Sequence, residues 1–251
     1  MEAILDVINT HEALIYSEFE ATIEMLSGAI FIAIIAGFFI GITLYNLKRV
    51  NGFISFLTLP LRIAMFVLGG YPVIALAVLL VPFLQSQVGT IIGIEAAQPI
   101  LMISGAFYFA TLLYRAFANT DDEDGIAGKV IKSLRSLVLM LISSSAVLGM
   151  IGMGGLGGIL LNYGFFRFDY PFAIVIAVIY AVMVLVVEFA ALLLLTIMSP
   201  IRTVKATQKA EKIARTVNIE KTDREKAETV TQEPQSTTAK QIDIDSLIRR
   251  R

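Results

Sequence analysis

The chain has 251 residues, of which 57% are hydrophobic and 16% charged, and its formal net charge at pH 7 is −1. So large an apolar fraction excludes an ordinary soluble domain and is typical of an integral membrane protein. The sequence contains no cysteine and one histidine, His11. These counts exclude disulfides, thiolate metal sites, cysteine nucleophiles and histidine-cluster metal sites. We expect His11 to be a solvated helix residue.

Five long apolar stretches follow one another along the chain. They begin near Ser27, Phe53, Gly89, Leu134 and Pro171. Each supplies the roughly 20 apolar residues that a helix needs to cross a hydrocarbon core. The sequence therefore predicts an all-α integral membrane protein with five transmembrane helices.

The charges between these stretches predict their orientation. Six acidic residues and no basic ones precede the first stretch, whereas Lys48 and Arg49 follow it. The gap between the third and fourth stretches is basic again, with Arg115, Lys129, Lys132 and Arg135. Basic residues favour the cytoplasmic side, so we expect a plasma-membrane protein with its N-terminus outside and its C-terminus inside. Because this charge pattern reflects topology, it indicates no nucleic-acid partner.

The pattern divides the chain into three segments. Residues 1–26 form an external amphipathic segment, residues 27–200 the five-helix transmembrane domain, and residues 201–251 a basic, polar cytoplasmic tail. The tail has the composition of a disordered segment, and its basic residues are expected to contact membrane lipid. Pro60, Gly69, Gly70 and Pro72 predict a broken helix in the second stretch. Pro99 and Gly105 are expected to interrupt the third.

Two motif blocks give the chain a family resemblance. The first runs from Ser145 to Gly157 as S-A-V-L-G-M-I-G-M-G-G-L-G, with Tyr163-Gly164 and Arg167 after it. The second comprises Pro72, Pro82-Phe83, Val88-Gly89-Thr90, Gly93 and Ala96-Ala97. In order and spacing, both blocks resemble the permease subunit of ATP-driven methionine importers, within the binding-protein-dependent ABC permease family. The resemblance covers about half of the chain, between residues 68 and 170.

This resemblance implies a permease subunit that forms the membrane pathway for a small amino acid of the methionine class. It implies a homodimer or pseudo-dimer that works with a separate ATPase and an external substrate-binding protein. The chain has no P-loop of the G-x-x-x-x-G-K-[ST] type, so we expect no enzyme activity and no cofactor in this subunit. The expected pathway or gate residues are Ser145, Gly149, Gly152, Gly154, Gly155 and Gly157. For Ser145, backbone capping within its own helix is the alternative.

One loop departs from the family pattern. Family permeases carry an E-A-A-x-x-x-G loop between the third and fourth spans, which docks on the ATPase. Here a shorter acidic loop lacks that motif, and its candidate ATPase-facing residues are Asp122, Glu123, Asp124 and Gly125. Coupling to an ATPase requires a contiguous element that both sites bias. A permease-like scaffold or regulatory subunit without ATP coupling is therefore the alternative function.

The fifth stretch carries an ionisable residue at membrane depth. Glu188 is flanked by Val186, Val187 and Phe189. Such a carboxylate is costly when charged and unpaired, so it is expected to be protonated, paired or beside water. Arg62 is expected to approach it by snorkelling. A proton-coupled carrier that uses Glu188 is a further alternative, beside a purely structural hydrogen bond to a neighbouring helix.

Overall fold

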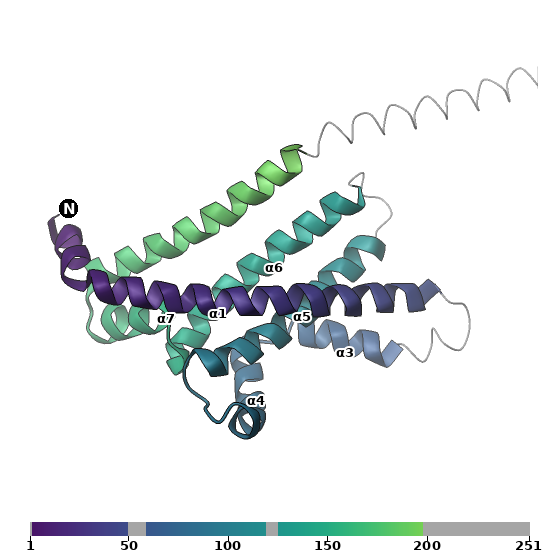
Figure 1. The fold of residues 1–251 in the computed structure, drawn as a ribbon, viewed down its shortest axis with the longest axis horizontal. Helices are drawn as coiled ribbons and strands as arrows, with labels where there is room; N and C mark the ends of the chain where they lie inside the picture. The colour runs from purple at the N-terminus through teal and green to yellow at the C-terminus, as the bar shows by residue number, and fades with distance from the viewer. Residues whose placement is uncertain (1, 50–58, 119–124, 198–251) are drawn as a thin grey trace, which may run out of the picture. The chain divides into compact units, whose positions relative to one another are not determined.

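The computed structural model describes residues 2–49, 59–118 and 125–197, and every regular element in these ranges is a helix (Figure 1). The predicted tail 201–251 lies outside the described residues, and so do Asp122, Glu123 and Asp124. Four described helices are long and apolar enough to cross a membrane, or up to five if a bent pair counts as one span. The all-helical membrane fold is thus confirmed, with a span count of four to five.

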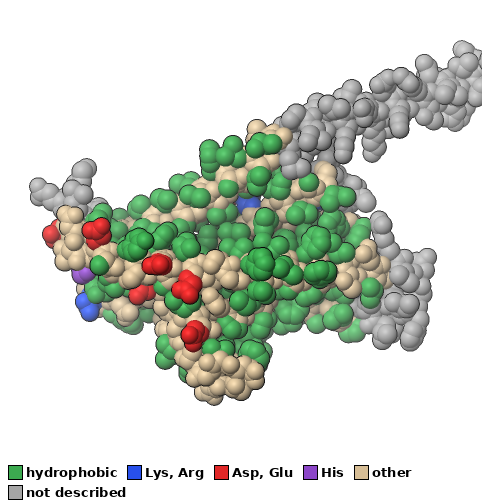
Figure 2. All heavy atoms as spheres, viewed as in Figure 1, with side chains coloured by type: hydrophobic (Ala, Val, Ile, Leu, Met, Phe, Trp, Pro, Cys, Tyr) green, Lys and Arg blue, Asp and Glu red, His purple; other side chains and the backbone are tan. Residues whose placement is uncertain are grey.

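Helix α1 (Glu2–Arg49) joins the predicted amphipathic segment and the first span in one helix of 48 residues. At 1.5 Å per residue it is about 72 Å long, more than twice the thickness of a hydrocarbon core. The amphipathic part has an apolar side in the structure. Its residues Val7, Leu14, Ile15 and Phe19 pack against a buried cluster made of Leu156, Ile159, Phe172 and Ile176. Figure 2 shows acidic side chains gathered over this N-terminal part, with hydrophobic ones covering most of the remaining face.

The predicted break in the second stretch is confirmed. Helices α3 (Leu59–Gly69) and α4 (Val73–Gln87) meet at an angle of 109°. Pro72 is the N-cap residue of α4, where its missing N–H costs nothing. Gly69 lies so close to α5 that a Cβ there would stand 2.6 Å from Thr111 Oγ1. Pro72 thus allows the bend between α3 and α4, and Gly69 allows this corner to pack closely against α5.

Helix α5 (Ile94–Ala118) is continuous, so the predicted interruption at Pro99 and Gly105 is wrong. Pro99 lies in the second turn, where the loss of one hydrogen bond leaves the rest of the ladder intact. Gly105 has a packing role instead, since a Cβ there would stand 2.9 Å from the Ala33 Cβ and 3.1 Å from Leu141 Cδ2.

Helix α5 is the centre of the bundle and contacts α1, α3, α4 and α6 (Ile126–Leu148). Its contact with α1 depends on small residues: a Cβ on Gly37 would lie 2.7 Å from the carbonyl oxygen of Ala106, and one on Gly41 3.0 Å from that of Ala110. Such small-xxx-small pairs allow two helices to approach closely. Here the pair packs within one chain.

The chain continues from α6 through two short π-helical segments, η1 (Gly149–Met153) and η2 (Leu160–Phe166), with α7 (Leu156–Ile159) between them. A last helix, Tyr170–Ile197, follows. Only 11% of the apolar window of this helix is buried, against 56% for α5. The last helix therefore lies at the edge of the described bundle, and α5 at its core.

Candidate functional site: a glycine-lined cleft

The glycine run turns the chain back on itself after α6. Gly152, Gly154 and Gly155 have φ angles of +99°, +81° and +75°, which side chains other than glycine rarely adopt. The π-helical segments on either side of this turn are of a kind that occurs often at functional sites. Three positive φ angles in four residues explain why the turn requires glycine.

The two arms of this turn are in backbone contact. A Cβ on Gly157 would lie 2.1 Å from the carbonyl oxygen of Ala146, and a Cβ on Gly149 2.6 Å from that of Gly154. No side chain fits between backbones at these distances. Gly149 and Gly157 therefore allow the end of α6 and α7 to pack backbone against backbone.

Thr22 of α1 holds the glycine turn in place, and the sequence analysis missed it. Its Oγ1 accepts a hydrogen bond of 2.9 Å from the N–H of Leu156 and donates one of 2.8 Å to the carbonyl of Glu18. Thr22 is 1% exposed. A buried N–H without a partner is costly, so this hydroxyl positions the first residue of α7. A threonine with an i−4 carbonyl acceptor is too common in helices to signal this role.

Beside the turn lies a cleft of about 500 Å³. The predicted residues Gly149, Gly152 and Gly154 line it, whereas Ser145, Gly155 and Gly157 do not. Its other walls are Glu18 of α1, Asn162 and the apolar side chains Met150, Ile151, Ile159, Leu161 and Phe166. The volume is in the range of small-molecule sites. Glu18 and Asn162 were not predicted for this site.

Ser145 lies behind the cleft in the packed interior. It is 2% exposed, and its hydroxyl donates to the carbonyl of Ile142 at 2.8 Å. This is the backbone capping expected as the alternative role. The hydroxyl of Tyr180, from the last helix, is buried near Ser145 and completes no hydrogen bond within the described residues. That Ser145 lines a pathway stays a prediction.

Glu188 has a different partner from the one expected. Arg135 of α6 donates from Nη2 to Glu188 Oε1 at 2.5 Å. Arg62 instead donates to the Tyr114 hydroxyl at 3.2 Å, and its Nε is buried without a partner in the described part of the chain. The expected approach of Arg62 to Glu188 is wrong, because α3 packs against α5, whereas Arg135 of α6 reaches Glu188 on the last helix. A proton-relay role for Glu188 stays a prediction.

The remaining predicted residues fall elsewhere. Gly125 is the N-cap of α6 and has open space around it. His11 is packed rather than simply solvated, since its ring meets Tyr163 and Phe172 edge-on, each at 5.4 Å between centroids. Within the described ranges, no group of three or more acidic, His or Cys residues could hold a metal ion.

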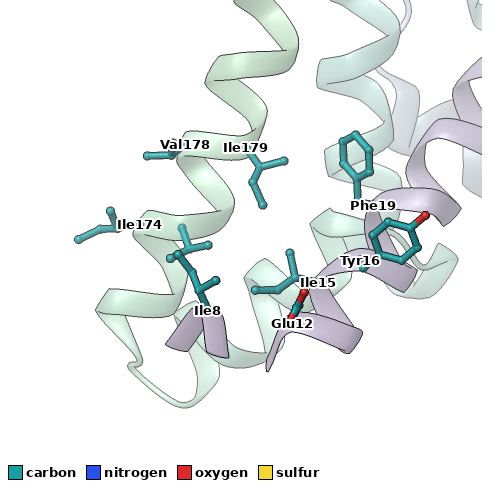
Figure 3. Close-up of a pocket in the computed structure, with 9 residues that line it drawn as sticks. Ile8, Glu12, Ile15, Tyr16, Phe19, Ile174, Val178 and Ile179 are labelled. Atoms are coloured by element: carbon teal, nitrogen blue, oxygen red, sulfur yellow. The ribbon is translucent and has the colours of Figure 1, made fainter. Parts of the chain in front are cut away.

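A second hollow lies between the N-terminal part of α1 and the last helix (Figure 3). It has about the same volume, 510 Å³, and nearly all its lining is apolar. Ile8, Ile15 and Phe19 line it from α1, and Ile174, Val178 and Ile179 from the last helix; Figure 3 shows the two helices that carry them. Within the described part of the chain, Glu12 is the one charged residue that lines it. Because the first cleft joins a carboxylate and an amide to an apolar wall, it is the better candidate for a polar ligand.

Comparison with known proteins identifies the fold. No family model matches the sequence, and no curated protein does. Among solved structures, two crystal forms of the MetNI methionine ABC transporter in inward-facing conformations are similar, a selenomethionine soak and a native form. Their TM-scores are 0.64 and 0.63 at 21% and 22% identity, and each match covers 72% of this chain and 94% of the transporter chain. The chain shares this transporter fold. Identity at this level establishes the fold alone.

Proposed function

We propose that this protein is the permease subunit of an ABC-type importer for a small amino acid of the methionine class. The fold match to a methionine ABC transporter chain, over 94% of that chain, is the observation that carries the proposal. The two motif blocks support it independently, since they span residues 68–170 in the order of the family.

The packing of the bundle supports a pathway shared between two copies. Ile100, Leu113 and Leu141 are 0% exposed and Phe109 is 1% exposed, so apolar side chains fill the centre of the described helices. A polar solute cannot cross such a core at acceptable cost. We therefore place the pathway at the surface of the bundle, where a second copy completes it, with the glycine-lined cleft at its gate.

The proposal assigns the remaining parts of the importer to other chains. Without a P-loop, this subunit depends on a separate ATPase, and an external binding protein delivers the substrate. The orientation proposed is the one the charges favour, with the N-terminus outside the plasma membrane and the C-terminus in the cytoplasm. Membrane lipid surrounds the apolar outer faces.

A specific observation favours a second candidate, a permease-like scaffold or regulatory subunit. Helix α5 ends at Ala118 and α6 begins at Ile126, so little chain is left between them for an element that docks on an ATPase. A helical turn takes 3.6 residues, so the seven residues 119–125 correspond in length to about two turns of helix. The scaffold has the same fold but couples no ATP hydrolysis to transport.

Reconstitution separates the two candidates. The full chain is purified from its native membrane with whatever ATPase and substrate-binding protein accompany it and placed in proteoliposomes. Accumulation of radiolabelled L-methionine is then measured with and without ATP on the side of the ATPase. The importer predicts ATP-dependent accumulation, which the vanadate inhibitor abolishes. A chain that reconstitutes as a folded protein, brings no ATPase and accumulates no methionine refutes the importer and favours the scaffold.

A further inference from the structure

We infer that Glu18 binds the ammonium group of the solute in the glycine-lined cleft, and so selects amine-bearing solutes such as apolar amino acids. This inference rests on the proposed function and deepens it, because it names the residue that recognises the substrate and the group recognised.

The position of Glu18 is fixed at the cleft. Its carbonyl accepts a hydrogen bond from the Thr22 hydroxyl, and that hydroxyl oxygen in turn accepts one from the N–H of Leu156 at the start of α7. One hydroxyl thus links the backbone of Glu18 to the glycine turn. A site residue held by such a rigid link keeps its geometry relative to the opposite wall.

The carboxylate of Glu18 is available for a ligand. It is partly buried, and within the described residues it forms no ion pair or side-chain hydrogen bond. Among the residues that the structure describes, no basic side chain lines the cleft, and Glu18 is the only charged one that does. A partly desolvated carboxylate without a partner is unfavourable, and an ammonium group supplies both the opposite charge and strong hydrogen-bond donors.

The rest of the lining fits the remainder of an amino acid. Asn162 offers an amide that can donate to a carboxylate. Met150, Ile151, Leu161 and Phe166 form an apolar wall for an aliphatic or thioether side chain. A cleft that joins one anionic, one amide and several apolar groups is complementary to a zwitterion with an apolar side chain.

The other acidic residues of α1 do not share this environment. Glu20 is exposed and does not line the cleft. Glu12 lines the second, apolar hollow shown in Figure 3, where no amide side chain accompanies it among the described residues. The inference is therefore specific to Glu18, and Glu20 provides a matched control on the same helix.

The experiment measures binding to the full chain in lipid nanodiscs by equilibrium dialysis. Three probes differ by one group each: L-methionine, 3-(methylthio)propylamine, which lacks the carboxylate, and 4-(methylthio)butanoate, which lacks the ammonium. They are compared on the wild type, Glu18→Gln and Glu20→Gln. We expect Glu18→Gln to weaken both amine-bearing probes by about tenfold or more and to leave the butanoate unchanged. Glu20→Gln should change none of the three.

Several outcomes overturn the inference. One is a loss below about threefold in Glu18→Gln, and another is an equal loss for all three probes, which would indicate a structural role. A wild type that binds neither amine also refutes it. Binding of the propylamine alone, when it depends on Glu18, supports the inference and argues against methionine.

ATP-dependent uptake by the Glu18→Gln variant distinguishes a failure of the proposed importer function from a failure of the proposed role of Glu18. If uptake continues at the wild-type rate and KM, the importer stands and the role of Glu18 falls. If the wild type shows Glu18-dependent amine binding without ATP-dependent uptake, the importer falls and the amine site stands. Retained cooperative thermal unfolding in both Gln variants shows that the compared proteins are folded.

Discussion

Replacing Gly157 by alanine tests whether the backbone contact between the two arms of the glycine turn holds the turn together. The added Cβ would lie 2.1 Å from the carbonyl oxygen of Ala146 and 2.8 Å from its carbonyl carbon. Because these are backbone atoms, no side-chain rotation relieves the contact. Ordinary contact begins at 3.4 Å, so α7 must move from α6 by about 3.4 − 2.1 = 1.3 Å.

The cost of this movement outweighs the gain from a better helix former. Overpacking that shifts the backbone costs about 1–3 kcal/mol, and a contact with backbone atoms that no rotamer change relieves belongs at the upper end, about 3 kcal/mol. Alanine recovers about 1 kcal/mol of helix propensity in α7. We expect a net loss of about 2 kcal/mol in the free energy of unfolding, a factor of about 30 in the folding equilibrium.

The assay is reversible unfolding in mixed micelles by titration with sodium dodecyl sulfate, followed by far-ultraviolet circular dichroism. Gly70→Ala is the control, because the nearest atom to a Cβ there is the Phe66 carbonyl oxygen at 3.6 Å. If the free energies of unfolding of Gly157→Ala and Gly70→Ala agree within about 0.5 kcal/mol, the two arms of the turn are not tightly packed and the reasoning is wrong.

Two further predictions concern polar contacts between helices. Thr22→Val leaves the buried N–H of Leu156 without an acceptor and should cost about 1–3 kcal/mol in the same unfolding assay, whereas Thr22→Ser should retain most of the stability; equal losses in the two variants would contradict the role of the hydroxyl. For the ion pair, Arg135→Gln and Glu188→Gln should each destabilise the fold by leaving one charge without its partner, and the double variant should be more stable than the less stable single variant. Strictly additive losses in this double-mutant cycle would show that the two residues do not interact.

Local sequence signals predicted the elements well where one residue type decides the backbone. Pro72 and the glycines before it predicted the corner between α3 and α4, because proline ends hydrogen-bonded helices and glycine weakens them. The predicted interruption at Pro99 is wrong because tertiary packing, and not the local sequence, decides the backbone there. Close packing against α1 and α6 keeps α5 continuous where the local pattern alone favoured a break.

The apolar stretches, their lengths and the positions of glycine and proline determined by themselves that this is an all-helical membrane protein with a break in its second stretch. Only the tertiary structure showed that Glu188 pairs with Arg135 rather than Arg62, and that Glu18 and Thr22 of α1 meet the turn from more than 130 residues away. Burial in lipid and backbone conformation depend on each residue and its near neighbours, so composition reveals them. Partners between helices depend on how several helix faces pack at once, and a single sequence does not state which faces meet.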